Sequence, residues 1–113
     1  FYERENFAAS SLTKAPEGMT SPVVATHEVA VLDIGKVMAE IRPTALVCDI
    51  EGAEAELLPL ADLSSLRVAV VELHPQWIGQ AGVQAVFDAF HAAGLTFYPK
   101  TSDKKVVTFM KGW

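Results

Sequence analysis

Cysteine is almost absent from this 113-residue chain, which contains only Cys48. A single cysteine forms neither an intrachain disulfide nor a cysteine cluster for a metal ion. Leu46, Val47 and Ile50 are its neighbours in the sequence, and they indicate an inert, buried thiol rather than a nucleophile. We therefore expect a reducing, cytoplasmic environment.

Clustered basic residues and long apolar runs are also missing. The chain contains nine Lys and Arg and fourteen Asp and Glu, which gives a formal net charge of −5. Lys104 and Lys105 are the only adjacent basic pair in the sequence. Phosphate backbones require clustered Lys and Arg, so nucleic acid is not an expected partner. An acidic chain is not attracted to an anionic membrane surface, and no apolar run approaches the roughly 20 residues of a membrane span.

Several motifs that bind cofactors or perform catalysis are absent. The sequence has no G-x-G-x-x-G after a strand, no Walker loop, no G-x-S-x-G and no H-E-x-x-H. Its three histidines are dispersed and lack zinc spacing, so we assign no metal ligand. The chain thus carries acidic residues but no motif that binds a cofactor phosphate or carboxylate, which is the pattern expected of one half of an active site.

What the sequence does contain is enough apolar material for a core. Half of the residues are hydrophobic, too many for a disordered chain. The length fits one small domain or part of a larger one. The first residue is Phe1 rather than Met, and we expect the chain to be a piece of a longer protein.

The apolar pattern alternates between strand and helix periods. We expect an irregular arm over residues 1–22, with turn-prone residues between Ser10 and Pro22. The predicted strands are 23–31, 45–50, 68–73, 95–98 and 106–110, and the predicted helices are 34–42 (capped by Asp33), 53–60 and 79–93. This order predicts an α/β fold with a mostly parallel sheet, helices on its faces and a terminal antiparallel hairpin. The unbroken apolar run 45–50 favours a strand buried on both faces.

Acidic side chains follow the two central strands. Asp49 and Glu51 come after one strand, and Glu72 and His74 end the next. Ligands bind at the carboxyl ends of strands in open α/β sheets, so we expect these groups at one rim. Residues two apart in an extended segment point the same way, so Asp49 and Glu51 are expected to act together as a general base or a cation site.

Simpler roles for the same residues remain open. Glu51 and Glu54 are also placed to cap the following helix, where the dipole favours acids, with Asp49 fixing the turn. His74 is equally suited to being a polar strand end held by a hydrogen bond before Pro75.

The segment Asp49-Ile50-Glu51-Gly52-Ala53-Glu54 resembles the Asp-x-Glu-Gly-Ala-Glu signature of FkbM-family methyltransferases, class I enzymes that use S-adenosylmethionine. The likeness covers most of the chain from about Ser10 onward. It is supported by Val31-Leu32-Asp33 upstream, by the apolar strand ending in Glu72, and by the final helix and hairpin.

Two departures from the family are visible. Val47 stands where the family commonly has Lys, and the family's N-terminal half, with its glycine-rich loop and ribose-binding acid, is missing. The resemblance therefore implies a Rossmann-like partial domain over residues 23–113, equivalent to strands four to seven in the spatial order 4-5-7-6. Strand 45–50 would expose an edge, predicting self-association or pairing with an N-terminal part.

The resemblance also implies a reaction, methyl transfer from S-adenosylmethionine to a hydroxyl of a sugar or natural-product acceptor. Asp49 or Glu51 would be the base or substrate clamp with Glu54 in support, and Glu72 and His74 would border the acceptor pocket. A divalent cation that polarises the hydroxyl is an alternative role for the acids. The main cofactor site would lie outside this chain, so the chain alone is expected to be inactive.

Two other classes of function compete with this interpretation. Cys48-Asp49-Ile50-Glu51-Gly52 is similar to the Asp-x-Asp-Gly-Thr loop of haloacid-dehalogenase-type, magnesium-dependent phosphotransferases, with Glu51 replacing the second Asp. A non-catalytic interaction module of the same fold is the other alternative.

Overall fold

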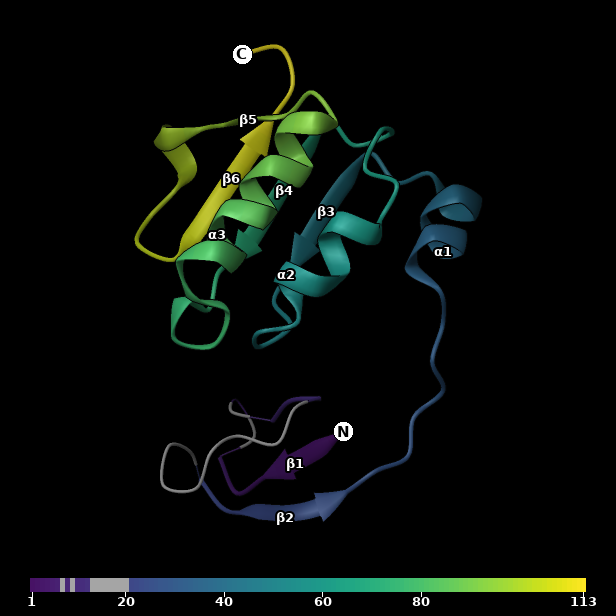
Figure 1. Ribbon diagram of the computed structural model, residues 1–113, viewed down its shortest axis with the longest axis vertical. Helices are drawn as coiled ribbons and strands as arrows, with labels where there is room; N and C mark the ends of the chain where they lie inside the picture. The colour runs from purple at the N-terminus through teal and green to yellow at the C-terminus, as the bar shows by residue number, and fades with distance from the viewer. Residues whose placement is uncertain (7, 9, 13–20) are drawn as a thin grey trace. The chain divides into compact units, whose positions relative to one another are not determined.

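The computed structural model describes residues 1–6, 8, 10–12 and 21–113, which form two compact units, 1–31 and 32–113 (Figure 1). The expected boundary after residue 22 falls inside the first unit. Most of the turn-prone tract between Ser10 and Pro22 lies outside the described residues.

The first unit is built on a short antiparallel pair, β1 (Tyr2–Arg4) and β2 (Val23–Thr26). Across it, the imidazole of His27 pairs with Glu3 at 2.7 Å. The predicted strand 23–31 is wrong beyond Thr26, because three-residue β1 offers no partner there and Val29 and Val31 are exposed. This strand is therefore not part of the main sheet.

The second unit contains a four-stranded sheet in the order β3-β4-β6-β5. Its strands are β3 (Ala45–Cys48), β4 (Val68–Glu72), β5 (Thr96–Phe97) and β6 (Val106–Met110). β3 and β4 are parallel, whereas β6 is antiparallel to both of its neighbours. The small α/β fold and the terminal antiparallel hairpin are therefore confirmed, and the described sheet is mixed, with one parallel and two antiparallel strand pairs.

The described helices of this unit are α1 (Ile34–Ile41), α2 (Glu54–Leu57), which continues into the 3₁₀ turn η2 (Leu58–Leu60), and α3 (Pro75–Ala92), with a further turn η3 (Pro99–Thr101). The side chain of Asp33 caps α1 by accepting from the Lys36 amide at 2.9 Å. α3 is kinked at Gly79, whose φ of 64° is non-helical. The helix predicted from residue 79 is therefore the long segment after this kink.

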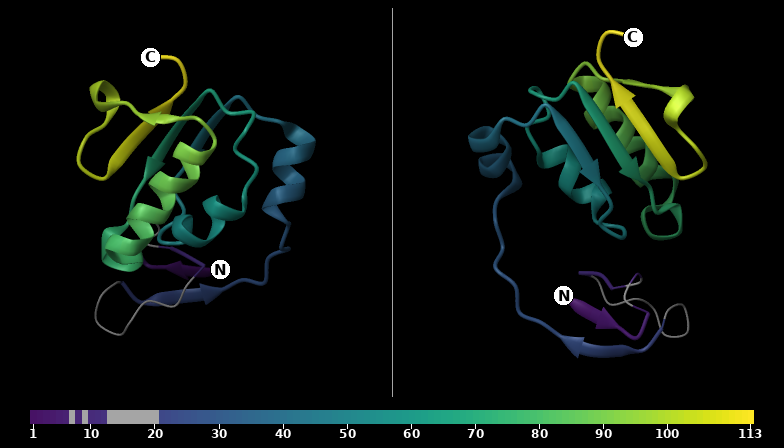
Figure 2. Two further views of the ribbon diagram at one scale, coloured as in Figure 1. Left: turned by 45° about the horizontal axis from the view of Figure 1, so that its top comes forward. Right: turned by 180° about the vertical axis from the view of Figure 1, so that it is seen from behind.

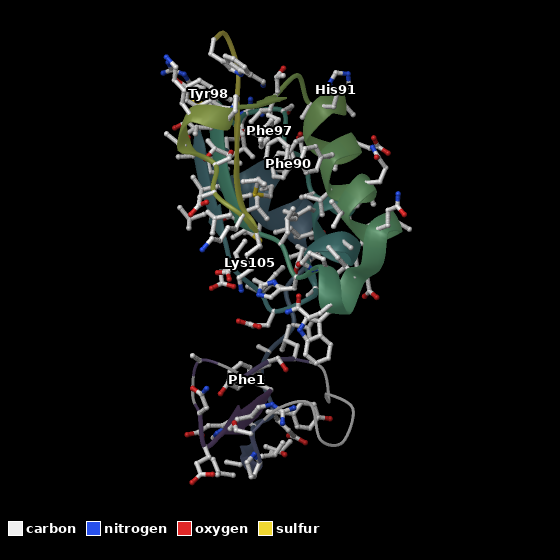
Figure 3. The ribbon with its side chains drawn as sticks, turned by 90° about the vertical axis from the view of Figure 1, so that its left-hand side faces the viewer. Phe1, Phe90, His91, Phe97, Tyr98 and Lys105 are labelled. Carbon is white, nitrogen blue, oxygen red and sulfur yellow. The ribbon has the colours of Figure 1, made fainter. Side chains whose placement is uncertain are left out.

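The core lies between one face of the sheet and α3. Ala69 and Val71 of β4 and Phe109 of β6 are buried against Val86 and Phe90. The ring of Phe90, labelled in Figure 3, stacks on that of Phe109 with the two centroids 4.4 Å apart. Burial of this aromatic and aliphatic surface is what holds the carboxyl ends of β3 and β4 beside the start of α3.

The opposite face of β3 is open. Figure 2 shows α2 and α3 on one face of the sheet and β3 at its edge. Val47 of β3 is 82% exposed, whereas its neighbour Cys48 is buried. The expectation of a strand buried on both faces is therefore wrong in the described structure, because an edge strand covered by helices on one side buries only alternate residues.

Candidate functional site

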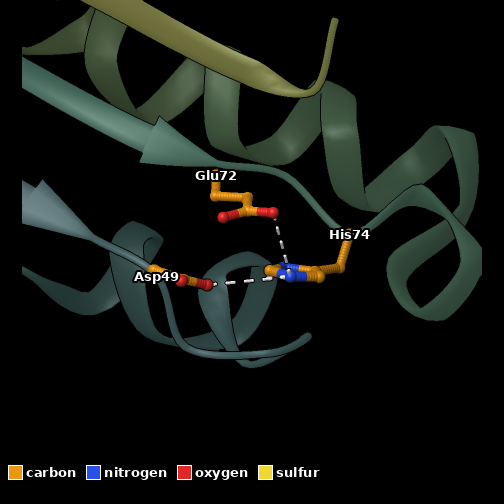
Figure 4. Close-up of side chains that lie close together, drawn as sticks. All are labelled: Asp49, Glu72 and His74. Carbon is orange, nitrogen blue, oxygen red and sulfur yellow. Dashed lines mark ion pairs between the residues drawn. The ribbon is translucent and has the colours of Figure 1, made fainter. Parts of the chain in front are cut away.

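The acidic residues and His74 meet at the carboxyl ends of two parallel strands. Asp49 directly follows β3, Glu72 is the last residue of β4, and His74 precedes the first turn of α3. Figure 4 shows the two carboxylates directed toward the imidazole ring. The site residues predicted from the sequence, Asp49, Glu51, Glu54, Glu72 and His74, all belong to this cluster.

Glu54 is the fully buried carboxylate of the cluster. Its side chain has no solvent exposure, and one oxygen accepts from the His74 amide at 2.8 Å and lies 3.2 Å from His74 Nδ1. The other oxygen accepts from the Gly52 amide at 2.9 Å. Because the carboxylate is an acceptor, Nδ1 carries the proton in this contact. Glu54 therefore fixes both the orientation and the tautomer of His74.

A tight turn carries Glu51 into the site. Glu51 has φ 52° and Gly52 has φ 101°, so both lie in the left-handed region. Gly52 also passes so close to Trp77 that a Cβ atom would lie 2.9 Å from that residue's Cβ. Asp49 and Glu51 both face the His74 ring, but the extended chain expected between them is wrong, since β3 ends at Cys48 and Glu51 lies in the turn.

The second ring nitrogen of His74 faces three carboxylates. His74 is 1% exposed, and its Nε2 lies 3.3 Å from Glu51, 3.7 Å from Asp49 and 4.0 Å from Glu72. Among the described residues, this nitrogen has no hydrogen-bond partner. A buried polar atom without a partner is unusual and calls for an explanation.

Lys105 is a member of the site that sequence reasoning missed. Its ammonium group pairs with Glu72. The hydrogen bond that Lys105 donates holds the pKa of the Glu72 carboxyl below its usual value, with a smaller contribution from the lysine charge. Lys105 directly precedes β6, whose first residue, Val106, pairs with Glu72, so the signal for it is the antiparallel register rather than any motif.

The structure agrees with the simpler role considered for His74 but not with the one considered for Glu51. The His74 amide is held by a hydrogen bond before Pro75, as that interpretation expects. Glu51 does not cap α2, because this helix begins at Glu54 and its N-cap residue, Ala53, makes no side-chain cap hydrogen bond. Cys48 beneath the site is buried, as predicted, and burial together with the charges of Glu54 and Asp49 raises the pKa of its thiol to about 11.

A separate hollow of about 530 Å³ lies between η2 and α3 and does not include the cluster. Small apolar side chains such as Ala85, Ala89 and Ala92 line much of it, with Asp62 and Asp88 as its acids. We place the candidate site at the cluster instead, because that is where buried and converging polar groups are found.

None of the described helices is long and apolar enough to cross a bilayer. Comparisons with protein-family models, with curated proteins and with solved structures find no match to this chain. The chemistry of the site is therefore argued from its residues.

Proposed function

We propose that this chain forms the acceptor side of an FkbM-type methyltransferase, in which a methyl group passes from S-adenosylmethionine to a hydroxyl of a sugar or natural product. The observation that carries the proposal is the convergence of Asp49, Glu51, Glu72 and His74 at the carboxyl ends of β3 and β4. These are the residues that the Asp-x-Glu-Gly-Ala-Glu segment and the following strand supply.

The sheet supports the same proposal. In the part of the chain that the structure describes, β3 forms one edge, and a reversed β6 lies between β4 and β5. A Rossmann-like sheet cut after its third strand would have this order. The exposed Val47 lies on β3, the strand that the first half of a complete Rossmann-like sheet would adjoin.

The proposed reaction forms an oxygen–carbon bond as the carbon–sulfur bond of the sulfonium breaks. S-adenosylhomocysteine leaves, and the hydroxyl proton passes to a carboxylate. Asp49 is 54% exposed and Glu51 is 30% exposed, so both are accessible to an acceptor. A hydroxyl is a weak nucleophile near pH 7, and a carboxylate within hydrogen-bond reach assists by accepting its proton.

The other residues have supporting roles in this scheme. Glu54 has no exposure and its oxygens are occupied by the Gly52 and His74 groups, which favours a positioning role over a catalytic one. Glu72 and His74 border the acceptor.

The test uses the complete gene product with methyl-labelled S-adenosylmethionine and a panel of sugars and other polyols. We expect label in the acceptor, and a loss of about 100-fold or more in Asp49→Asn and Glu51→Gln. Glu56→Gln is the matched control, because Glu56 is an exposed acid on α2. Full activity in both site variants would contradict the base assignment.

A parallel assay with a phosphate ester and magnesium separates the competing functions. Hydrolysis of a phosphate ester with magnesium, without methyl transfer, would support the phosphotransferase instead. Absence of both activities would leave a non-catalytic module and overturn the proposal.

A further inference from the structure

Nε2 of His74 is a buried ring nitrogen that has no hydrogen-bond partner among the described residues. The Nδ1 of the same ring contacts Glu54, which also accepts from the His74 backbone amide, so the ring cannot turn away without losing the Nδ1 contact. With the proton on Nδ1, Nε2 presents a lone pair. This buried lone pair is aimed at a group of carboxylate oxygens, which are themselves acceptors and cannot donate to it.

The electrostatics of the cluster call for a positive charge at the same point. Asp49, Glu51 and Glu72 surround Nε2 at 3.3 to 4.0 Å, and the described cation in contact with them is Lys105, which pairs with Glu72. Three carboxylates against one ammonium leave an excess of negative charge around this ring nitrogen. A cation between them would satisfy both the lone pair and the carboxylates.

The spacing fits a metal ion. One ligand atom each from Asp49, Glu72 and His74 lies within 4.8 Å of the others. Ligand atoms bound to one ion at about 2.1 Å are roughly 3.0 to 3.4 Å apart, so small side-chain rotations would close the site. Two carboxylates and an imidazole suit Mn²⁺, Fe²⁺, Co²⁺ or Zn²⁺ better than the all-oxygen ions Mg²⁺ and Ca²⁺.

We propose that Asp49, Glu72 and His74 bind one divalent transition-metal ion, with the Glu51 carboxylate close to the ring nitrogen of His74. Glu54 is the positioning residue, since a carboxylate on the far nitrogen of a ligating histidine is the usual outer-shell arrangement. This departs from the sequence-based expectation of no metal ligand. The proposal does not require methyl transfer, and only polarisation of an acceptor hydroxyl by the ion would rest on the proposed function.

The test is a calorimetric titration of MnCl₂ into the full chain after treatment with a chelator. We expect one Mn²⁺ per chain, with affinity reduced at least about tenfold in Asp49→Asn, in Glu72→Gln and, through the histidine, in Glu54→Gln. Glu56→Gln and Glu40→Gln, exposed acids on α2 and α1, should bind as the parent chain does. Circular dichroism of each variant separates lost binding from lost folding.

A second readout locates the ion independently of any substitution. Bound Mn²⁺ is paramagnetic and should broaden the ring signals of His74 while sparing His91, which lies at the opposite end of the second unit from Lys105 (Figure 3). No binding at millimolar Mn²⁺ would overturn the proposal, and so would equal weakening by the control substitutions or broadening of both histidines. The measurement involves no cofactor, so its failure is distinguishable from failure of the methyltransferase proposal.

Discussion

The buried carboxylate of Glu54 lies 3.2 Å from Nδ1 of His74 and also accepts from that residue's backbone amide. This contact joins α2 to the start of α3 through two residues that are 20 positions apart in the sequence. It leaves the other ring nitrogen facing Asp49, Glu51 and Glu72. One buried pair therefore sets the geometry of the whole cluster.

Removing the charge of Glu54 should destabilise the fold. In Glu54→Gln, an NH₂ group replaces one of the two carboxylate oxygens. That group would face either the Gly52 amide or the His74 N–H groups, and it cannot accept a hydrogen bond from them. We expect a loss of about 2 to 3 kcal/mol in the free energy of unfolding, measured with urea. The exposed Glu56→Gln should change it by less than about 0.5 kcal/mol. Equal stability of the two variants would contradict a structural role for the buried carboxylate.

Gly52 is predicted to resist substitution. A Cβ there would lie 2.9 Å from the Cβ of Trp77, in a residue whose φ is 101°. Gly94→Ala is the matched control, since its φ of 81° also disfavours a side chain, but a Cβ there would meet the Lys111 Cε at an ordinary 3.6 Å. We expect Gly52→Ala to cost at least about 1 kcal/mol more in thermal unfolding than Gly94→Ala. A smaller cost than that of the control would show that the turn adapts.

Cys48 should react slowly while the chain is folded. Its thiol pKa is raised from 9.0 to about 11, chiefly by burial, which lowers the thiolate fraction near pH 8 by about 100-fold. We expect alkylation by iodoacetamide to be slower by at least that factor in the native chain than in urea. Similar rates in the two conditions would contradict the burial of the thiol.

The same shift predicts a pH dependence of stability. Between pH 9 and about 11 the unfolded thiol has released its proton and the folded one has not, so the unfolded state binds fewer protons. The contribution of Cys48 is fully present below pH 9 and falls as the pH rises toward 11. Cys48→Ala should lose less stability than the parent chain over this interval, and parallel curves would refute the assignment.

Strand β3 is predicted to mediate self-association of this chain. It is an edge strand of the described sheet, and Val47 on it is 82% exposed. Lysine on an edge strand opposes strand pairing, so Val47→Lys should keep the chain monomeric at concentrations where the parent chain associates in sedimentation velocity. Val24→Lys, at an exposed position of β2, is the control. A parent chain that stays monomeric throughout would contradict the prediction.

Much of the second unit could be predicted from its sequence, because its strands are short apolar runs bounded by turns. The strand predicted over Val106–Met110 has the same bounds as β6. The apolar spacing that predicts α1 and the capping role of Asp33 also agree with the structure. The length of β2 could not be predicted, because it depends on pairing with β1. The exposure of Val47 was missed for a similar reason, since burial of an apolar run depends on which elements cover it.

Five members of the site were predictable from the sequence, whereas Lys105 and the geometry of the cluster were not. Parallel strands that lie side by side bring Asp49 and Glu72 to one rim, whatever the turn between strand and helix. The left-handed conformation of Glu51 has no signal in its residue type, since only Gly52 marks the turn. The buried contact between Glu54 and His74 depends on tertiary packing of α2 against α3, which a local pattern does not encode.

The central claim is that this chain carries the acceptor side of a methyl-transfer site and not the cofactor side. Calorimetric titration of S-adenosylmethionine, into this chain and into the complete gene product, tests it most directly. The account predicts micromolar binding by the gene product and no binding, or very weak binding, by this chain alone. Micromolar binding by this chain alone, or none by the gene product, would contradict it.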